Sequence, residues 1–221
     1  MTFLLRLSWI AVITLFVFMH SIDGLAQSGQ KFLALGDSYT IGESVPENER
    51  WPVQLAKALR DQGKSVGDPF IIATTGWRTD NLKEAIVKAN LKSDYDLVSL
   101  LIGVNNQYQG KSAVLYATEF EDLLETVIQL AKGKKENVFV VSIPDYGYTP
   151  LGKPKQTAIS LALDQFNEIN KEITEKHHVK YFSITDISRK GLAEPDLVAS
   201  DGLHPSGKMY TQWVERIVKG L

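Results

Sequence analysis

Five short apolar runs alternate with longer amphipathic stretches, and this alternation restricts the fold more than any other feature of the sequence. The apolar runs are rich in β-branched residues and predict strands at Phe32–Leu35, Phe70–Ala73, Leu97–Ile102, Val138–Ile143 and Val179–Ile184. The amphipathic stretches predict helices over residues 50–62, 79–92, 112–132, 156–177 and 206–219. We therefore predict an α/β fold, a single-domain three-layer α/β/α sandwich with a five-stranded parallel sheet.

Two hydroxyl residues mark the expected starts of long helices. Ser112 and Thr157 stand at the beginning of amphipathic stretches, where a hydroxyl can accept a hydrogen bond from a free backbone N–H. The longest irregular stretch, PDYGYTPLGKPK at residues 144–155, follows a predicted strand. Open α/β sheets bind ligands at the carboxyl ends of their strands, so we expect this loop to border a binding site.

The first 26 residues have the layout of a secretory signal peptide. Arg6 precedes an apolar core over Leu7–Met19, and Gly24-Leu25-Ala26 places small residues at the cleavage positions. The core is shorter than the roughly 20 residues that a membrane-crossing helix needs. We predict cleavage after Ala26, one domain over residues 27–221, and an exported protein, periplasmic or secreted. An uncleaved N-terminal anchor is the alternative.

The charge balance and the absence of cysteine restrict the partners. The chain has 24 Lys and Arg against 26 Asp and Glu, a formal net charge of −2, which gives no basic footprint for nucleic acid or anionic lipid. Without cysteine the chain has no disulfide and no lipidated N-terminal cysteine. We therefore expect no nucleic-acid partner and no stable membrane anchor after signal cleavage.

The stretch FLALGDSYTIG, residues 32–42, places Gly36-Asp37-Ser38 directly after a predicted strand. It is either an ordinary strand-to-helix corner or a turn that presents Ser38 as a nucleophile. A serine hydroxyl needs a base, and it needs donors for the negative charge that develops on the attacked carbonyl oxygen. The interpretation depends on whether other loops supply those groups.

Residues 27–221 contain three histidines as candidate bases. His177 and His178 end a charged helical stretch, where they are expected to contact helix-end carbonyls and water. His204 lies in SDGLHPSG, a turn-rich stretch with Asp201 three residues upstream. A carboxylate on the same turn can orient the imidazole and stabilise its protonated form, although a lone Asp-x-x-His is a weak signal.

Two further loops offer hydrogen-bond donors at strand ends. Asn105 follows Gly103 in LLIGVNNQYQG, and its side-chain amide is a suitable donor for an oxyanion. Gly76 in TTGWRTDNL can offer a backbone N–H with no side chain in the way. Each loop alone is also consistent with ordinary turn chemistry.

Four blocks therefore arrive in the order Ser38, Gly76, Asn105 and Asp201/His204, and in this order the sequence resembles the SGNH hydrolases, the GDSL-type esterases and lipases. Gly36–Gly42 and Asp201–Pro205 carry the strongest resemblance, and Gly103-Val104-Asn105 matches the third block. The Asp that usually follows this asparagine is Asn106 here. In the second block Gly76 is the only firm element.

The resemblance implies a flavodoxin-like fold and a serine hydrolase. It implies that Ser38 is the nucleophile, that His204 is the base and that Asp201 is the partner of His204. It also implies an oxyanion hole made by the N–H groups of Ser38 and Gly76 and by the Asn105 side chain. It implies neither a metal nor a cofactor.

The substrate is less closely defined. The expected class is a small-molecule carboxylic ester, such as an acylated sugar, a lysophospholipid or a short acyl ester. An acyltransferase that uses the same site, and a non-catalytic carbohydrate-binding module on the same fold, remain open at this point. The loop residues expected around the cleft as tentative substrate contacts are Trp77, Asn106, Gln107, Tyr108, Tyr146 and Tyr148.

Overall fold

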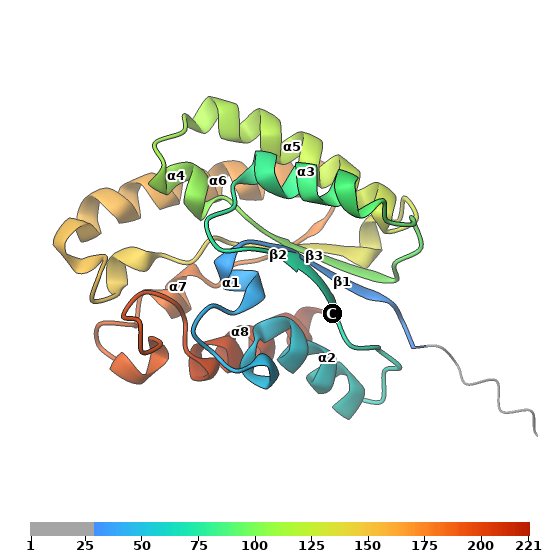
Figure 1. Ribbon diagram of the computed structural model, residues 1–221, viewed down its shortest axis with the longest axis horizontal. Helices are drawn as coiled ribbons and strands as arrows, with labels where there is room; N and C mark the ends of the chain where they lie inside the picture. The colour runs from blue at the N-terminus through green and yellow to red at the C-terminus, as the bar shows by residue number, and fades with distance from the viewer. Residues whose placement is uncertain (1–28) are drawn as a thin grey trace, which may run out of the picture.

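A computed structural model describes residues 29–221, and the predicted signal peptide lies outside them (Figure 1). Five strands form one sheet in the order β2-β1-β3-β4-β5, and every neighbouring pair is parallel. The strands are β1 (Phe32–Gly36), β2 (Phe70–Ala73), β3 (Leu97–Leu101), β4 (Val138–Val141) and β5 (Lys180–Phe182). The parallel α/β fold predicted from the alternation is confirmed.

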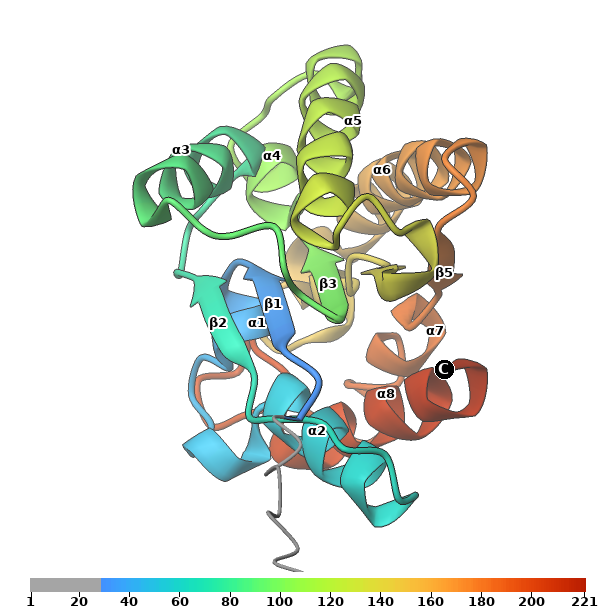
Figure 2. The ribbon, with the colours of Figure 1, turned by 90° about the vertical axis from the view of Figure 1, so that its right-hand side faces the viewer.

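Helices cover both faces of the sheet, as Figures 1 and 2 show. One layer contains α3 (Thr79–Ala89), α4 (Val104–Tyr108), α5 (Ala113–Leu130) and α6 (Gln156–Lys176). The other contains α1 (Ser38–Ile41), α2 (Trp51–Asp61), α7 (Thr185–Ser188) and α8 (Gly207–Gly220). Short 3₁₀ turns are η1 (Glu47–Glu49), η2 (Lys135–Asn137), η3 (Tyr146–Tyr148), η4 (Lys153–Lys155) and η5 (Pro195–Leu197).

Burial follows the position of each strand in the sheet. Every residue of the three inner strands β1, β3 and β4 is buried, because helices pack on both of their faces. The edge strands β2 and β5 are only partly covered. The core therefore lies on both sides of the inner strands.

The two predicted helix starts have different outcomes. The Ser112 hydroxyl accepts from the Leu115 N–H at 3.2 Å and caps α5, as predicted. The prediction for Thr157 is wrong, because α6 already begins at Gln156 and its N-cap residue, Lys155, makes no side-chain cap. The start of α6 is set instead by the η4 turn that runs directly into it.

The strand order positions the functional loops. From β1 the chain crosses to β2 on one side, whereas from β3 it crosses to β4 on the other, so the order reverses between the adjacent strands β1 and β3. Loops that leave such a switch point diverge and open a crevice at the carboxyl edge of the sheet. Ser38 follows β1 and Asn105 follows β3, so both lie at this point. Within residues 29–221, no helix combines the length and the apolar character that crossing a bilayer requires.

Candidate active site

Ser38 lies at the turn between β1 and the short helix α1. The last residue of β1 must be glycine, because a Cβ on Gly36 would lie 2.5 Å from the Leu101 carbonyl oxygen of the neighbouring strand. Asp37 caps α1 by accepting from the Tyr39 N–H at 3.0 Å. Ser38 thus becomes the first residue of α1, and its side chain lines a cleft although only 5% of the residue is exposed.

The carboxyl of Asp37 braces this turn from within the protein. It is fully buried, and its second oxygen has no hydrogen-bond partner. Burial raises the pKa of Asp37 to about 7, and the hydrogen bond from the Tyr39 N–H only partly offsets this effect. Asp37 therefore supports the turn that presents Ser38.

Asp201 and His204 form a hydrogen-bonded pair on the loop before α8. The Nδ1 atom of His204 lies 2.6 Å from Asp201 Oδ2, and the other carboxylate oxygen accepts from the Leu203 and His204 backbone N–H groups at 2.9 and 3.0 Å. Ser44 donates its hydroxyl hydrogen to Oδ2 at 2.7 Å. Partial burial opposes ionisation of Asp201, but the bonds from His204, Ser44 and Leu203 outweigh it and hold the pKa of this carboxyl well below its usual range.

The structure brings residues 38 and 204 to one cleft, although they lie far apart in the sequence. The cleft has a volume of about 420 Å³ and is lined by both residues, together with Gly76 and Asn105. His204 is 8% exposed, and its ring packs edge-on against Tyr39 with the centroids 5.7 Å apart. Within residues 29–221, the hydrogen bond of the His204 ring is to Asp201, and none joins it to the Ser38 hydroxyl. In hydrolases such serine–histidine bonds commonly tighten only in the reacting complex.

Three hydrogen-bond donors border the same cleft. The N–H groups of Ser38 and Gly76 have no acceptor among the described residues. Gly76 has a φ of +84°, a left-handed conformation that favours glycine, although a Cβ there would meet no atom within 4 Å. The glycine is therefore needed for backbone conformation, not for space as the sequence interpretation assumed.

Asn105 uses one hydrogen of its amide to hold the neighbouring loop. Its Nδ2 donates to the Trp77 carbonyl oxygen at 3.0 Å, and the residue lines the cleft. An amide nitrogen carries two hydrogens, so the second has no acceptor among the described residues and is available to a ligand. This arrangement suits a donor to an oxyanion.

Only two of the six tentative substrate contacts line the cleft, namely Tyr108 and Tyr146. Their rings meet edge to face, with the centroids 6.2 Å apart. Tyr146 also donates its hydroxyl hydrogen to the side-chain oxygen of Gln107 at 3.0 Å, which places Gln107 behind the wall of the cleft.

The structure does not bring the other three tentative contacts, Asn106, Trp77 and Tyr148, to the lining of the cleft. Asn106 is fully buried, because α4 turns successive side chains by about 100° and directs Asn106 inward when Asn105 faces the cleft. Trp77 packs against the hydrophobic core. The Tyr148 ring lies beneath the Arg189 guanidinium at 6.0 Å.

Sequence reasoning missed most of the apolar wall. These residues carry no chemical signal in the sequence, since apolar side chains in loops occur for many reasons. Leu151, 65% exposed, lies in the long loop after β4 that was expected to border the site. The missed lining residues are Tyr39, Thr75, Val104, Leu151 and Leu203.

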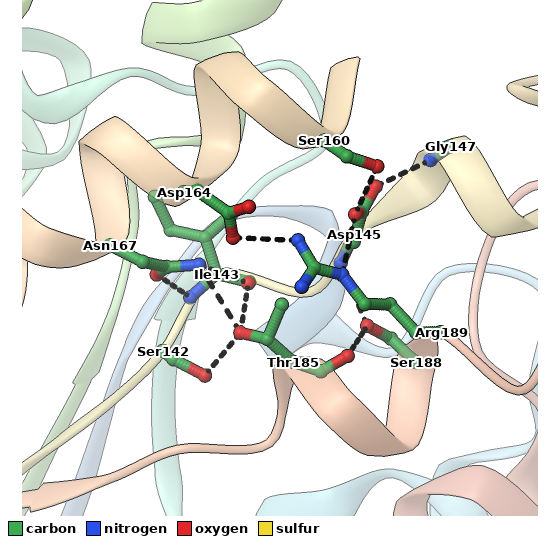
Figure 3. Close-up of polar contacts among 10 residues, drawn as sticks. All are labelled: Ser142, Ile143, Asp145, Gly147, Ser160, Asp164, Asn167, Thr185, Ser188 and Arg189. Carbon is green, nitrogen blue, oxygen red and sulfur yellow. Dashed lines mark hydrogen bonds and ion pairs between the residues drawn. The ribbon is translucent and has the colours of Figure 1, made fainter. Parts of the chain in front are cut away.

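A buried polar network fixes the loop that carries Tyr146 (Figure 3). The fully buried side chain of Asp145 accepts from the Gly147 N–H at 2.9 Å, from the Ser160 hydroxyl at 2.7 Å and from Arg189 Nε at 2.9 Å. Arg189 also pairs with Asp164 at 2.6 Å. The network therefore attaches the loop after β4 both to α6 and to the end of α7.

The end of β4 is held by a side chain of α6. The Ile143 N–H donates to Asn167 Oδ1 at 2.8 Å, and Asn167 Nδ2 donates to the Ile143 carbonyl oxygen at 2.9 Å. The amide of Asn167 thus replaces a strand partner, which is why the apolar run leaves the sheet after Val141. The predicted strand was two residues too long for this reason.

Comparison with known proteins matches residues 34–212 to the GDSL-like Lipase/Acylhydrolase family. The chain belongs to this family. The match extends from β1 into α8 and so includes every loop that borders the cleft. The chain is accordingly an ester hydrolase, and the non-catalytic binding module is set aside.

Several known proteins resemble this GDSL family member over most of its length. An arylesterase of Vibrio mimicus is 25% identical over 207 residues, which cover 91% of this chain and 92% of that protein. The crystal structure of TesA superposes with a TM-score of 0.66 at 16% identity, covering 86% of this chain and 97% of the other. An acetylxylan esterase, Axe2 of Geobacillus stearothermophilus, gives 0.64 at 18% identity, with 87% and 94% covered. The two structures establish the shared fold.

Proposed function

We propose that this GDSL hydrolase cleaves carboxylic esters through an acyl-enzyme on Ser38. The observation that carries the proposal is that His204, which is hydrogen-bonded to Asp201 at 2.6 Å, lines the same cleft as Ser38. His204 takes the proton of the Ser38 hydroxyl as its oxygen attacks the ester carbonyl, and returns that proton to the leaving alcohol. Water then repeats the cycle on the acyl-enzyme and releases the acid. Asp201 orients the imidazole and stabilises its protonated form.

The negative oxygen of the tetrahedral intermediate is bound by three donors in this proposal. They are the backbone N–H groups of Ser38 and Gly76 and the second amide hydrogen of Asn105. All three belong to residues that line the cleft, and the two N–H groups have no other acceptor among residues 29–221. Donors that are already in place cost no reorganisation when charge develops, which is why they accelerate acyl transfer.

The cleft favours a neutral, mainly apolar acyl or aryl group. Among residues 29–221, no Lys, Arg, Asp or Glu side chain lines it, and its wall is formed largely by tyrosine rings and aliphatic side chains. A phosphate or carboxylate placed against this wall, outside the oxyanion hole, would lose its hydration without gaining a cationic partner. Among the expected substrates, a short acyl or aryl ester therefore fits better than a lysophospholipid head group, and the arylesterase relative is consistent with this choice.

The decisive experiment compares residues 27–221 with the Ser38→Ala variant on p-nitrophenyl esters of graded acyl length and on acetylated sugars. We expect hydrolysis of short acyl esters by the parent, and loss of both turnover and organophosphate labelling in the variant. Unchanged labelling of the variant would place the nucleophile elsewhere. Adding a sugar or lipid acceptor shows whether the acyl group passes to water or to another hydroxyl, which separates a hydrolase from an acyltransferase.

We also propose that the enzyme works outside the cytoplasm. The proposal rests on the signal-peptide layout of the first 26 residues. Expression of the full chain followed by cell fractionation and N-terminal sequencing is expected to give an extracytoplasmic product that begins at Gln27. An intact N-terminus in the membrane fraction would instead indicate the uncleaved anchor.

A further inference from the structure

Asn106 follows Asn105, a donor of the proposed oxyanion hole, on α4, but its side chain is buried in the protein. It is 0% exposed and connects α4 to the first residue of α3, Thr79. Its Oδ1 accepts from the Thr79 N–H at 3.1 Å, and its Nδ2 donates to the Thr79 hydroxyl oxygen at 2.7 Å. The N-cap residue Arg78 offers no side-chain acceptor, so Asn106 satisfies a backbone donor that the start of α3 would otherwise leave free.

The loop that carries Gly76 is attached to α4 by neighbouring side chains. Asn105 donates to the Trp77 carbonyl oxygen at 3.0 Å, and Gln109 donates to the Gly76 carbonyl oxygen at 3.2 Å. Asn106 provides the buried attachment, where the loop enters α3. The direction of the Gly76 N–H therefore depends on how α4 and the start of α3 meet.

The carboxylate of Glu119, on α5, restricts the hydrogen-bonding groups that the side chain at position 106 can carry. The Thr79 hydroxyl donates its one hydrogen to Glu119 Oε2, and Asn106 Nδ2 lies 3.3 Å from the same oxygen. Position 106 must therefore present an acceptor to the Thr79 N–H and a donor to both Thr79 and Glu119. An amide does both, whereas an ionised carboxylate donates nothing and would face a second carboxylate.

We propose that Asn106 is a positioning residue that fixes the Gly76 loop through Thr79, and that its amide is matched to the carboxylate of Glu119. This inference rests on the proposed function, because it assigns Asn106 to the support of the oxyanion hole. It also explains why asparagine stands where the resemblance expects aspartate. Asn106 acts on the reaction only through the loop that it holds.

The test is Asn106→Asp, read as the ratio of its kcat to that of the parent from pH 5 to pH 8. At pH 8 the introduced carboxylate repels Glu119 and releases Thr79, so we expect a loss of about 10- to 100-fold, mainly in kcat. The ratio should recover toward low pH, where the introduced carboxyl regains a hydrogen to donate. The ratio cancels the titration of groups common to both proteins.

The double variant Asn106→Asp/Glu119→Gln exchanges the amide and the carboxylate and keeps the charge. We expect kcat within about threefold of the parent, because donors and acceptors are again paired. Asn170→Asp is the matched control, since Asn170 is also fully buried on α6 but its side chain has no hydrogen-bond partner among the described residues. It should lower stability and leave kcat of the folded enzyme unchanged.

The outcomes separate this inference from the proposed function. A parent without esterase activity contradicts the proposed function, and urea unfolding then tests the pairing of positions 106 and 119. A double variant that regains the urea midpoint lost in Asn106→Asp supports the pairing, and one that does not regain it overturns the pairing. An active parent with a pH-independent ratio near 1 for Asn106→Asp overturns the positioning role. If Asn106→Asp does not fold, a double variant that is folded and active supports the pairing, and one that stays unfolded or inactive overturns it.

Discussion

At the scale of single residues, Asp201 is the most heavily hydrogen-bonded group of the site. It accepts from two backbone N–H groups, from the His204 ring and from the Ser44 hydroxyl. Ser44 contributes from a left-handed backbone conformation with φ of +65°, which costs energy for any residue except glycine. That a serine occupies this conformation indicates a role for its hydroxyl.

Two substitutions of Ser44 separate the effect of its hydroxyl group from the effect of its backbone conformation. Ser44→Ala and Ser44→Gly both remove a donor that lowers the pKa of Asp201, so kcat should fall by a similar factor, about 3- to 10-fold, in both. Only the glycine variant relieves the backbone, so it should be more stable than the alanine variant by about 0.5–1 kcal/mol. Ester hydrolysis and urea unfolding measure the two effects, and equal kcat in all three proteins would remove the hydroxyl from the site.

Asn105 gives a second residue-scale prediction. Asn105→Ala removes the side-chain donor of the proposed oxyanion hole, which typically costs about 10²–10³ in kcat, or near 3 kcal/mol. It also frees the Trp77 carbonyl oxygen, but Gln109 still holds the loop at Gly76. Steady-state kinetics with a p-nitrophenyl ester should show a loss in kcat with little change in KM. A pure rise in KM would argue for substrate binding instead.

At the scale of elements, the loop after β4 depends on the pair between Arg189 and the fully buried Asp145 (Figure 3). Arg189→Ala leaves this carboxylate with the Gly147 and Ser160 donors but without a counter-charge. We expect a loss of about 2–4 kcal/mol in the free energy of unfolding. Arg216→Ala removes an exposed pair with Asp186 and should cost about 1 kcal/mol or less. Urea unfolding measures the loss of free energy of unfolding in both variants. Equal losses would contradict the prediction that the pair with the buried Asp145 contributes more than the exposed pair.

Sequence prediction was most accurate for the positions of the strands and the long helices. The five strands and five long helices were placed within a few residues, because hydrophobic periodicity extends over enough residues to be recognised. The helices α1, α4 and α7 were missed, since four or five residues are too few to show a period. Missing α4 had a direct consequence: Asn106 was expected beside Asn105 on the cleft, whereas the helix turns it into the core.

The chemical residues of the site were easier to predict than its walls. Ser38, Gly76, Asn105 and His204 line one cleft, as the order of the blocks implied. Polar residues beside glycine at strand ends are recognisable without coordinates. Leu151 and its apolar neighbours are not, because only the folded loops show which of them face the cleft.

At the scale of the whole molecule, the buried Asp37 couples folding to pH. Its pKa is about 7 when folded and near 4 when unfolded, so the folded chain keeps a proton that the unfolded chain has released. The free energy of unfolding should therefore fall as pH rises from about 4 to 7, by about 2–4 kcal/mol, and then level off. Asp201 has the opposite effect, because its pKa is lowered in the folded chain. Its contribution to the free energy of unfolding is complete above about pH 4 and is lost as the pH falls below that value.

The variant that tests this coupling is Asp37→Asn. Its amide oxygen can still accept from the Tyr39 N–H, but it has no proton to exchange in this range. Urea unfolding between pH 5 and pH 8 should show a marked slope for the parent and a nearly flat line for the variant. Parallel lines would assign the pH dependence to other groups.

The proposed nucleophile follows the first strand of the described fold, and its proposed base precedes the last helix. A nascent chain that contains only the first four strands therefore has Ser38 but does not yet have its proposed base, His204. On the proposed mechanism, esterolysis begins only once the final segment has docked. A cell that exports the chain before folding would thus be protected from the activity of its own product until the polypeptide has left.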